Sequence, residues 1–229
     1  MGRSPRIQAP DITFHIINRG NGKNTIFHSD KDFHEYLELL QCYQEKFDMR
    51  IYHYVLMSNH VHILVEPSKE NSISKFMQGL TLAHTMRFNM RYQSVGHVWQ
   101  GRFKSIPIET DIYFLQCGRY IELNPVRAGI VSHPSRYPWS SYQFYAQGKQ
   151  NKLLNTDPFY DELGSSTSQR RERYTQYIEE ELPNIHARSA IRFSQDLVYG
   201  SESFVNKLKN DFNYEPTRRK GGRPKINQT

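Results

Sequence analysis

Residues 50–66 read RIYHYVLMSNHVHILVE, and the expected architecture is built around this stretch. Its two halves, 50–57 and 60–66, are rich in β-branched and aromatic residues, which favour strands. The Ser58-Asn59 pair between the halves suits a tight turn. The stretch therefore predicts a β-hairpin.

The segments on either side of the hairpin extend this pattern. Before it, residues 12–18 alternate as a strand does, and apolar residues recur at helical spacing over 29–47. After it, a helical apolar stripe starts behind a cap at Asn71 or Ser72, and residues 98–108 alternate again. The order β-α-β-β-α-β is typical of an α+β, ferredoxin-like sandwich with an antiparallel sheet, in which helices cover one face and leave the other to ligands. RNA-recognition modules share this order, so the fold alone does not decide the function.

Beyond residue 110 the sequence predicts a smaller helical part. Asp111 can cap a helix that residues 124–129 end. Residues 149–169 are polar and rich in Gly, Ser and Asn, which indicates a linker between a main domain of residues 1–148 and a C-terminal helical extension of residues 170–212. This extension is a second candidate for DNA binding. Its expected helices cover residues 170–182, 187–199 and 201–212.

The charge of the chain favours a polyanionic partner. The sequence has 30 Lys and Arg against 23 Asp and Glu, which gives a net charge of +7 and a pI near 9.3. Between residues 218 and 229 five basic side chains face no acidic one, so we expect residues 213–229 to form a basic flexible tail. No apolar run approaches the ~20 residues of a membrane span, and the first ten residues lack the apolar core of a signal peptide. We expect a cytoplasmic protein without a membrane partner.

Two residue pairs are candidates for a chemical site. His60 and His62 stand two apart on the expected strand, so both rings project from one face and can share a divalent ion. A bare His-x-His pair also arises by chance, and it becomes informative only with further groups nearby. Tyr120 and Asn124, four apart on the expected helix, bring a phenol and an amide oxygen to one face. Asn124 before Pro125 equally fits a helix N-cap, and no pattern singles out Tyr120 among 15 tyrosines.

Four sequence blocks, taken in order, resemble the signature blocks of a known family. They are MSNHVHILV at 57–65, WQGRFKS at 99–105, RYIELNPVRAG at 119–129 and YPWSSY at 137–142. Together they are similar to the single-tyrosine HUH transposases of the insertion-sequence type, and most closely to the REP-associated branch. The resemblance runs from about residue 5 to residue 145, which identifies residues 1–148 as the transposase domain.

The resemblance implies a role for each of the four candidate residues. His60 and His62 match the metal ligands of the family, Asn124 matches the third ligand, and Tyr120 matches the nucleophile. It implies a Mg²⁺- or Mn²⁺-dependent enzyme that cuts and rejoins single-stranded DNA beside palindromic hairpins through a 5′-phosphotyrosine. The two-tyrosine spacing of many replication initiators is absent around Tyr120. We expect the protein to act as a monomer or a homodimer.

Basic and aromatic residues in or near these blocks are candidates for contact with DNA. The candidates for phosphate contacts are Arg19, Arg87, Arg91, Arg102, Lys104, Arg119 and Arg127. The candidates for base stacking are Trp99, Phe103 and Tyr142. Arg223 lies in a Gly-Arg-Pro core similar to that of an AT-hook, although Gly221 stands where a flanking arginine is expected. Three alternatives stay open: the basic residues are merely solvated, the aromatic residues belong to the core, and the tail that contains Arg223 is disordered.

Two interpretations from other classes of function stay open. A domesticated, non-catalytic DNA-binding regulator would keep the same fold, but the intact His60, His62, Tyr120 and Asn124 argue for an enzyme. An RNA-recognition module would need aromatic-rich RNP strands, which the sequence lacks, and would leave the His pair without a role.

Overall fold

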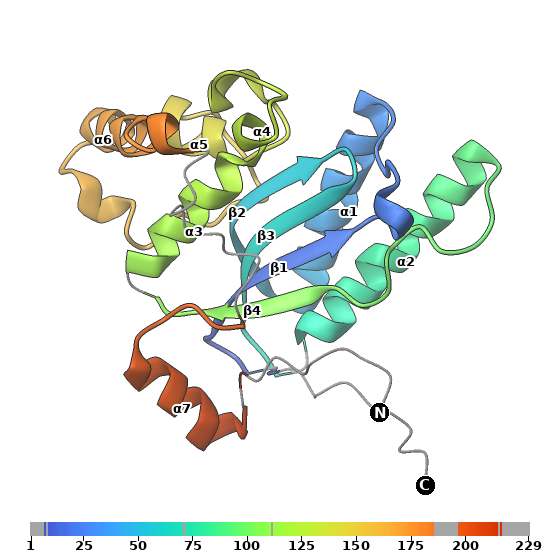
Figure 1. Ribbon diagram of the computed structural model, residues 1–229, viewed down its shortest axis with the longest axis horizontal. Helices are drawn as coiled ribbons and strands as arrows, with labels where there is room; N and C mark the ends of the chain where they lie inside the picture. The colour runs from blue at the N-terminus through green and yellow to red at the C-terminus, as the bar shows by residue number, and fades with distance from the viewer. Residues whose placement is uncertain are drawn as a thin grey trace, which may run out of the picture.

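The computed structural model describes residues 7, 9–70, 72–110, 112–185, 197–214 and 216 of the 229-residue chain. Its centre is a four-stranded antiparallel sheet with the strand order β2-β3-β1-β4 (Figure 1). The strands are β1 (Thr13–Arg19), β2 (Met49–Met57), β3 (His60–Pro67) and β4 (Lys104–Ile108). With one helix after β1 and one after β3, this order confirms the predicted α+β, ferredoxin-like sandwich.

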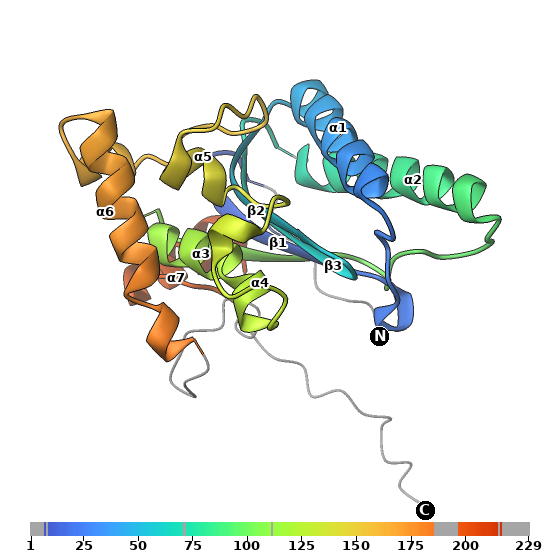
Figure 2. The same ribbon diagram turned by 90° about the horizontal axis from the view of Figure 1, so that it is seen from above.

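Helices α1 (Asp30–Phe47) and α2 (Ser72–Tyr92) cover one face of the sheet (Figure 2). The main hydrophobic core lies between these helices and the sheet, and its fully buried members include Ile16, Leu40 and Phe76. Helix α1 begins after Ser29, which forms a capping box with Asp32.

Asp32 also ties the start of α1 to the end of α2. Its carboxylate accepts hydrogen bonds from the backbone N–H groups of His28 and Ser29 and from the Tyr92 hydroxyl at 2.6 Å, and it pairs with Arg91. Burial would raise the pKa of Asp32, but these hydrogen bonds outweigh burial and lower it to about 2. The helix pair is thus fastened by one charged and nearly buried side chain.

The opposite face of the sheet is partly covered as well (Figure 2). Helices α3 (Ile112–Glu122), α4 (Asn124–Arg127), α5 (Tyr142–Gln147) and α6 (Thr167–Glu179) follow β4. Under α3, side chains such as Leu64, Ile106 and Phe114 form a second buried cluster, and tyrosines between α5 and α6 form a third. The expectation that helices cover only one face is therefore wrong.

The last expected strand is shorter than predicted. Only Lys104–Ile108 forms β4, because the regular pairing with β1 is interrupted around Gly101, which has a φ of +63°. Before this point Val98 and Gln100 still form backbone hydrogen bonds with Asn21 and Arg19. Trp99 makes only an isolated bridge to Gly20.

The structure describes only part of the C-terminal helices that the sequence predicts. Helix α7 (Glu202–Phe212), which begins after its N-cap Ser201, confirms the helix expected over 201–212. Of the helix expected over 187–199, residues 187–196 lie outside the described residues, and Tyr199 is not helical but bridges Ile108 of β4. Asn71 and Asp111, expected as helix caps, are also outside the described residues.

Residues 149–169, expected to form a linker, pack against the sheet. The Asn155 N–H donates to the Ile51 carbonyl at 2.7 Å, and the Ile51 N–H donates back to the Asn155 side chain. Leu153 and Asp157 are buried in the same stretch. The division of the chain into domains stays a prediction, but this segment holds α5 and α6 beside β2. None of the described helices is long and apolar enough to cross a membrane.

Two of the ion pairs between α1 and α2, Arg91 with Asp32 and Arg87 with Glu38, are expected to contribute very differently to stability. Replacing Asp32 with Asn should lower the free energy of unfolding by about 2–3 kcal/mol, because it breaks a nearly buried charged network. Replacing Glu38 with Gln removes an exposed pair with Arg87 at 3.9 Å and should cost less than about 0.5 kcal/mol. Urea unfolding of both variants measures the difference, and equal losses would contradict the role given to Asp32.

Candidate active site

Four aromatic side chains from three elements meet beneath α3. His60 and His62 project from β3, His15 projects from β1, and Tyr120 comes from α3. The register pairs Ile17 with His62, so His15 is the diagonal neighbour of His62 on the same face of the sheet. The structure therefore brings together the expected histidine pair and the expected tyrosine, and adds a third histidine.

The rings of this cluster are in close contact. The Nε2 atom of His15 lies 2.7 Å from Nδ1 of His62, and these rings are stacked with centroids 4.9 Å apart. The Tyr120 ring stands edge-on to both, 5.9 Å from His62 and 6.0 Å from His15. The His60 ring is 5.1 Å from that of His62. These separations allow one phosphate group to contact both the phenol and the histidine pair.

Hydrogen bonds orient both rings of the His-x-His pair. Nδ1 of His60 donates to the Asn59 side-chain oxygen at 2.6 Å, and Nδ1 of His62 shares a proton with His15. In each ring Nε2 is then the atom that can bind a metal, since ligating histidines are typically held through the other nitrogen. His15 thus sets the orientation of His62.

Both histidines are neutral at pH 7. Burial, followed by the positive charge of Arg19, lowers the pKa of His60 to about 4. Burial also lowers the pKa of His62 well below its usual value, and the nearby His15, His60, Arg19 and Arg127 lower it further. A neutral imidazole is the form that binds metals.

Asn124 is fixed to the backbone of the helix that carries Tyr120. Its Nδ2 atom donates to the carbonyl oxygens of Tyr120 at 2.9 Å and Ile121 at 3.3 Å, so Oδ1 is the atom with which this side chain can act as a ligand. The N-cap of α4 is Leu123, which makes the N-cap interpretation of Asn124 wrong. Gly129, with a φ of +69°, ends this segment as expected.

Three cationic side chains surround Tyr120 and the histidines. The Arg127 guanidinium lies 4.7 Å from the centre of the Tyr120 ring and donates to the Tyr120 carbonyl. Arg19 on β1 is paired with His60 on the neighbouring strand β3. Lys104 on β4 is paired with Ile17 of β1, which is itself paired with His62. Arg19 and Lys104 are exposed, so this end of the sheet face presents positive charge to solvent.

Several expected DNA contacts have other roles in the fold. Trp99 and Tyr142 are only 7% and 1% exposed, so neither ring offers an open face in this structure, and their stacking on unpaired bases stays a prediction. Phe103 packs partly against the main core. Arg119 stacks on Tyr177 at 4.1 Å and pairs with Glu181 at 3.4 Å, which directs it to α6 rather than to Tyr120.

The remaining candidates differ in their surroundings. Arg91 pairs with Asp32 and Glu35, and Arg87 pairs with Glu38, so both fasten α2 to α1. Arg102 is exposed and stays a candidate. Arg223 lies outside the described residues.

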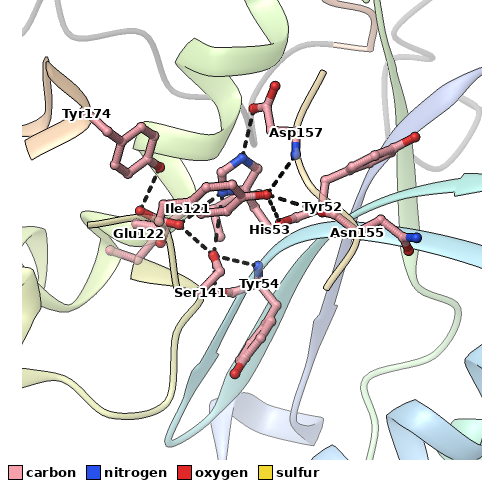
Figure 3. A network of polar contacts seen from close by, with 11 residues as sticks. Tyr52, His53, Tyr54, Ile121, Glu122, Ser141, Asn155, Asp157 and Tyr174 are labelled. Atoms are coloured by element: carbon pink, nitrogen blue, oxygen red, sulfur yellow. Dashed lines mark hydrogen bonds and ion pairs between the residues drawn. The ribbon is translucent and has the colours of Figure 1, made fainter. Parts of the chain in front are cut away.

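The sequence reasoning missed a buried polar network next to this site (Figure 3). His53 of β2 is fully buried between two carboxylates, with Nδ1 3.0 Å from Glu122 and Nε2 3.0 Å from Asp157. Burial lowers the pKa of His53, but its hydrogen bonds and charge interactions with Asp157 and Glu122 outweigh burial and raise it to about 9. His53 is therefore held positive at neutral pH.

Comparison with known proteins assigns the family. Residues 8–124, just over half of the 229-residue chain, match the family of IS200-like transposases, and the chain belongs to this family. The family resemblance predicted from the sequence is thereby confirmed, and transposases of this kind act in DNA strand transfer. No curated protein matches the sequence.

Two solved structures are similar to this chain. One is a REP-associated tyrosine transposase bound to a REP hairpin, with 17% sequence identity and a TM-score of 0.54, covering 68% of this chain and 94% of that one. This likeness supports the same fold. A candidate transposase from Deinococcus radiodurans R1 has 15% identity and a TM-score of 0.37 over 57% of this chain and 91% of that one, a level that adds nothing to the argument.

The buried charge on His53 predicts a loss of stability at alkaline pH. Because its pKa in the folded state lies above the unfolded value of 6.5, the stabilisation is complete below pH 6.5 and is lost as the pH rises through about 9. The free energy of unfolding should fall by on the order of 2–3 kcal/mol over this range. Urea unfolding at several pH values measures this loss, and an NMR titration of the His53 ring gives the midpoint directly. A midpoint at or below 6.5 would refute the assignment.

Proposed function

We propose that this chain is a metal-dependent DNA transposase that cuts and rejoins single-stranded DNA beside palindromic hairpins through a covalent bond to Tyr120. The observation that carries the proposal is the edge-on contact of the Tyr120 ring with His62, because a tyrosine beside a pair of neutral, oriented imidazoles suits the role of nucleophile. Family membership supports DNA strand transfer, and the similar hairpin-bound structure supports a hairpin as the DNA partner.

The metal in this proposal is a divalent ion such as Mg²⁺ or Mn²⁺. Nε2 of His60, Nε2 of His62 and Oδ1 of Asn124 would hold it. The amide oxygen is a ligand that Mg²⁺ and Mn²⁺ prefer, whereas imidazole is a more usual ligand of other transition metals. When bound, such an ion supplies Lewis-acid stabilisation and alignment for the scissile phosphate.

Tyr120 performs the covalent step in this proposal. Its hydroxyl oxygen attacks phosphorus, the bond to the 3′ oxygen breaks, and the released 3′ oxygen takes up a proton. The product is a 5′-phosphotyrosine that keeps a phosphodiester, so a different 3′-hydroxyl can reverse the step and join strands without ATP. The contact of Arg127 with the Tyr120 ring supports this step, because the guanidinium would put a positive charge near a phosphate that Tyr120 attacks.

The DNA backbone would cross the exposed, basic end of the sheet face. Arg19 lies beside His60 on the neighbouring strand, Lys104 lies one strand farther on β4, and Arg102 comes just before β4. Arg119 is not part of this surface, because its guanidinium is engaged by α6. Arg223 and the basic tail remain a second candidate for DNA contact.

A non-catalytic regulator is the alternative function. It would keep the DNA-binding surface but would not require oriented, neutral histidines beside a tyrosine. The hydrogen bonds of His60 to Asn59 and of His62 to His15 therefore favour the enzyme.

Replacing Tyr120 with Phe should abolish the covalent protein–DNA adduct on a single-stranded hairpin oligonucleotide. The change removes only the nucleophilic oxygen, so folding and hairpin affinity should stay close to those of the wild type. Tyr113→Phe, seven residues earlier on the same helix, is the control and should keep the adduct. Denaturing gel electrophoresis of labelled DNA measures both, and an adduct in the Tyr120→Phe protein would disprove the assignment of the nucleophile.

Replacing His60 with Ala should weaken the binding of Mn²⁺ by at least roughly tenfold, because one of three protein ligands is lost. His60 is half-buried at the end of β3, so the fold should tolerate the change. Electron paramagnetic resonance of free Mn²⁺ measures the affinity without reference to activity. The exposed His97 provides the control, and equal affinities in His60→Ala and His97→Ala would rule out the site.

A further inference from the structure

A buried network joins the helix that carries Tyr120 to a part of the chain beyond the residues that match the family, which end at 124 (Figure 3). At its centre is Glu122, the last residue of α3, which has no exposed surface. Oε1 accepts a hydrogen bond from Ser141 at 2.6 Å and contacts His53, and Oε2 accepts one from Tyr174 of α6 at 2.8 Å. Both carboxylate oxygens are therefore held by other segments.

The same network fixes how closely α3 approaches the sheet. A Cβ atom on Gly118 would lie only 2.6 Å from Nε2 of His53, so the backbone of α3 rests directly on the imidazole. The other side of that ring is stacked on Tyr145 at 4.5 Å, and Asp157 holds Nε2. Since His53 cannot move away, only glycine fits at position 118.

The geometry of a helix relates these contacts to the nucleophile. Gly118 and Glu122 are four residues apart and share one face of α3, whereas Tyr120, two residues from each, projects roughly to the opposite side. A small rotation or shift of α3 at Glu122 therefore moves the Tyr120 hydroxyl relative to His62. Misplacement of a reacting group by about 1 Å can cost roughly 100-fold in rate.

We infer that Glu122 is a positioning residue for Tyr120, and that Ser141, Asp157 and Tyr174, all beyond residue 124, hold Glu122 and His53 in place for this role. This inference rests on the proposed function. In this inference the segments around α5 and α6 support α3, the helix that carries Tyr120, and do not form an independent unit.

The chain offers a matched pair of variants for the test. Tyr174→Phe and Tyr160→Phe each remove one buried hydroxyl that donates a 2.8 Å hydrogen bond within the same cluster. Only the Tyr174 hydroxyl bonds Glu122, whereas that of Tyr160 bonds the Tyr145 carbonyl. At saturating hairpin DNA and Mn²⁺, well below both melting temperatures, Tyr174→Phe should slow adduct formation roughly tenfold with unchanged hairpin affinity. Tyr160→Phe should stay within about twofold of the wild type.

Each outcome of this comparison has a distinct meaning. Equal rates in the two variants, slowed or not, would overturn the positioning role while leaving the proposed function intact. If the wild type forms no adduct, the proposed function fails instead, and amide hydrogen exchange without DNA or metal still tests the inference. Exchange in α3 should be faster in Tyr174→Phe than in Tyr160→Phe, and equal exchange would overturn it.

Discussion

The antiparallel pairing of β1 with β3 is the constraint on which the rest of the structure depends. These strands are the two central ones, and their register puts His15, Ile17 and His62 on the face beneath α3 while Ile16 and Ile63 enter the main core. A slip of one residue would exchange the two faces and place imidazoles in the apolar core. Burial of apolar side chains on both faces therefore fixes the register, and with it the orientation of the histidine pair.

The sheet keeps one of its histidines positively charged and two others neutral, and the causes differ. His53 lies between Glu122 and Asp157 and stays protonated, because two carboxylates outweigh the cost of burial. His60 and His62 have cations for neighbours and stay neutral, since burial and positive charge act in the same direction. The chain thus separates a supporting ionic centre on β2 from a ligand pair on β3.

Local sequence patterns predict the strands and helices of this fold well, but they do not predict contacts between segments that are distant in the sequence. The spacing of apolar residues and the turn residues predict the hairpin at 50–66 and the order of strands and helices. The two-residue spacing of His60 and His62 predicts that they share one face of the sheet. The role of His15 depends on strand register, and the burial of Trp99 depends on packing, neither of which a single sequence reveals. Residues 149–169 have the composition of a linker, yet Asn155 and Asp157 satisfy buried groups on β2 that lie a hundred residues earlier.

The opposite orientations of Tyr120 and Glu122 on α3 have a consequence for the evolution of such chains. Substitution of Tyr120 by Phe removes one hydroxyl from the side of the helix that faces His62 and leaves the contacts of Glu122 with Ser141 and Tyr174 untouched. A mobile element could therefore lose catalysis in one mutational step and leave behind a folded protein that still recognises DNA. A substitution at Glu122 would not have this result, because it would disturb the packing of α3 and the position of Tyr120 at the same time.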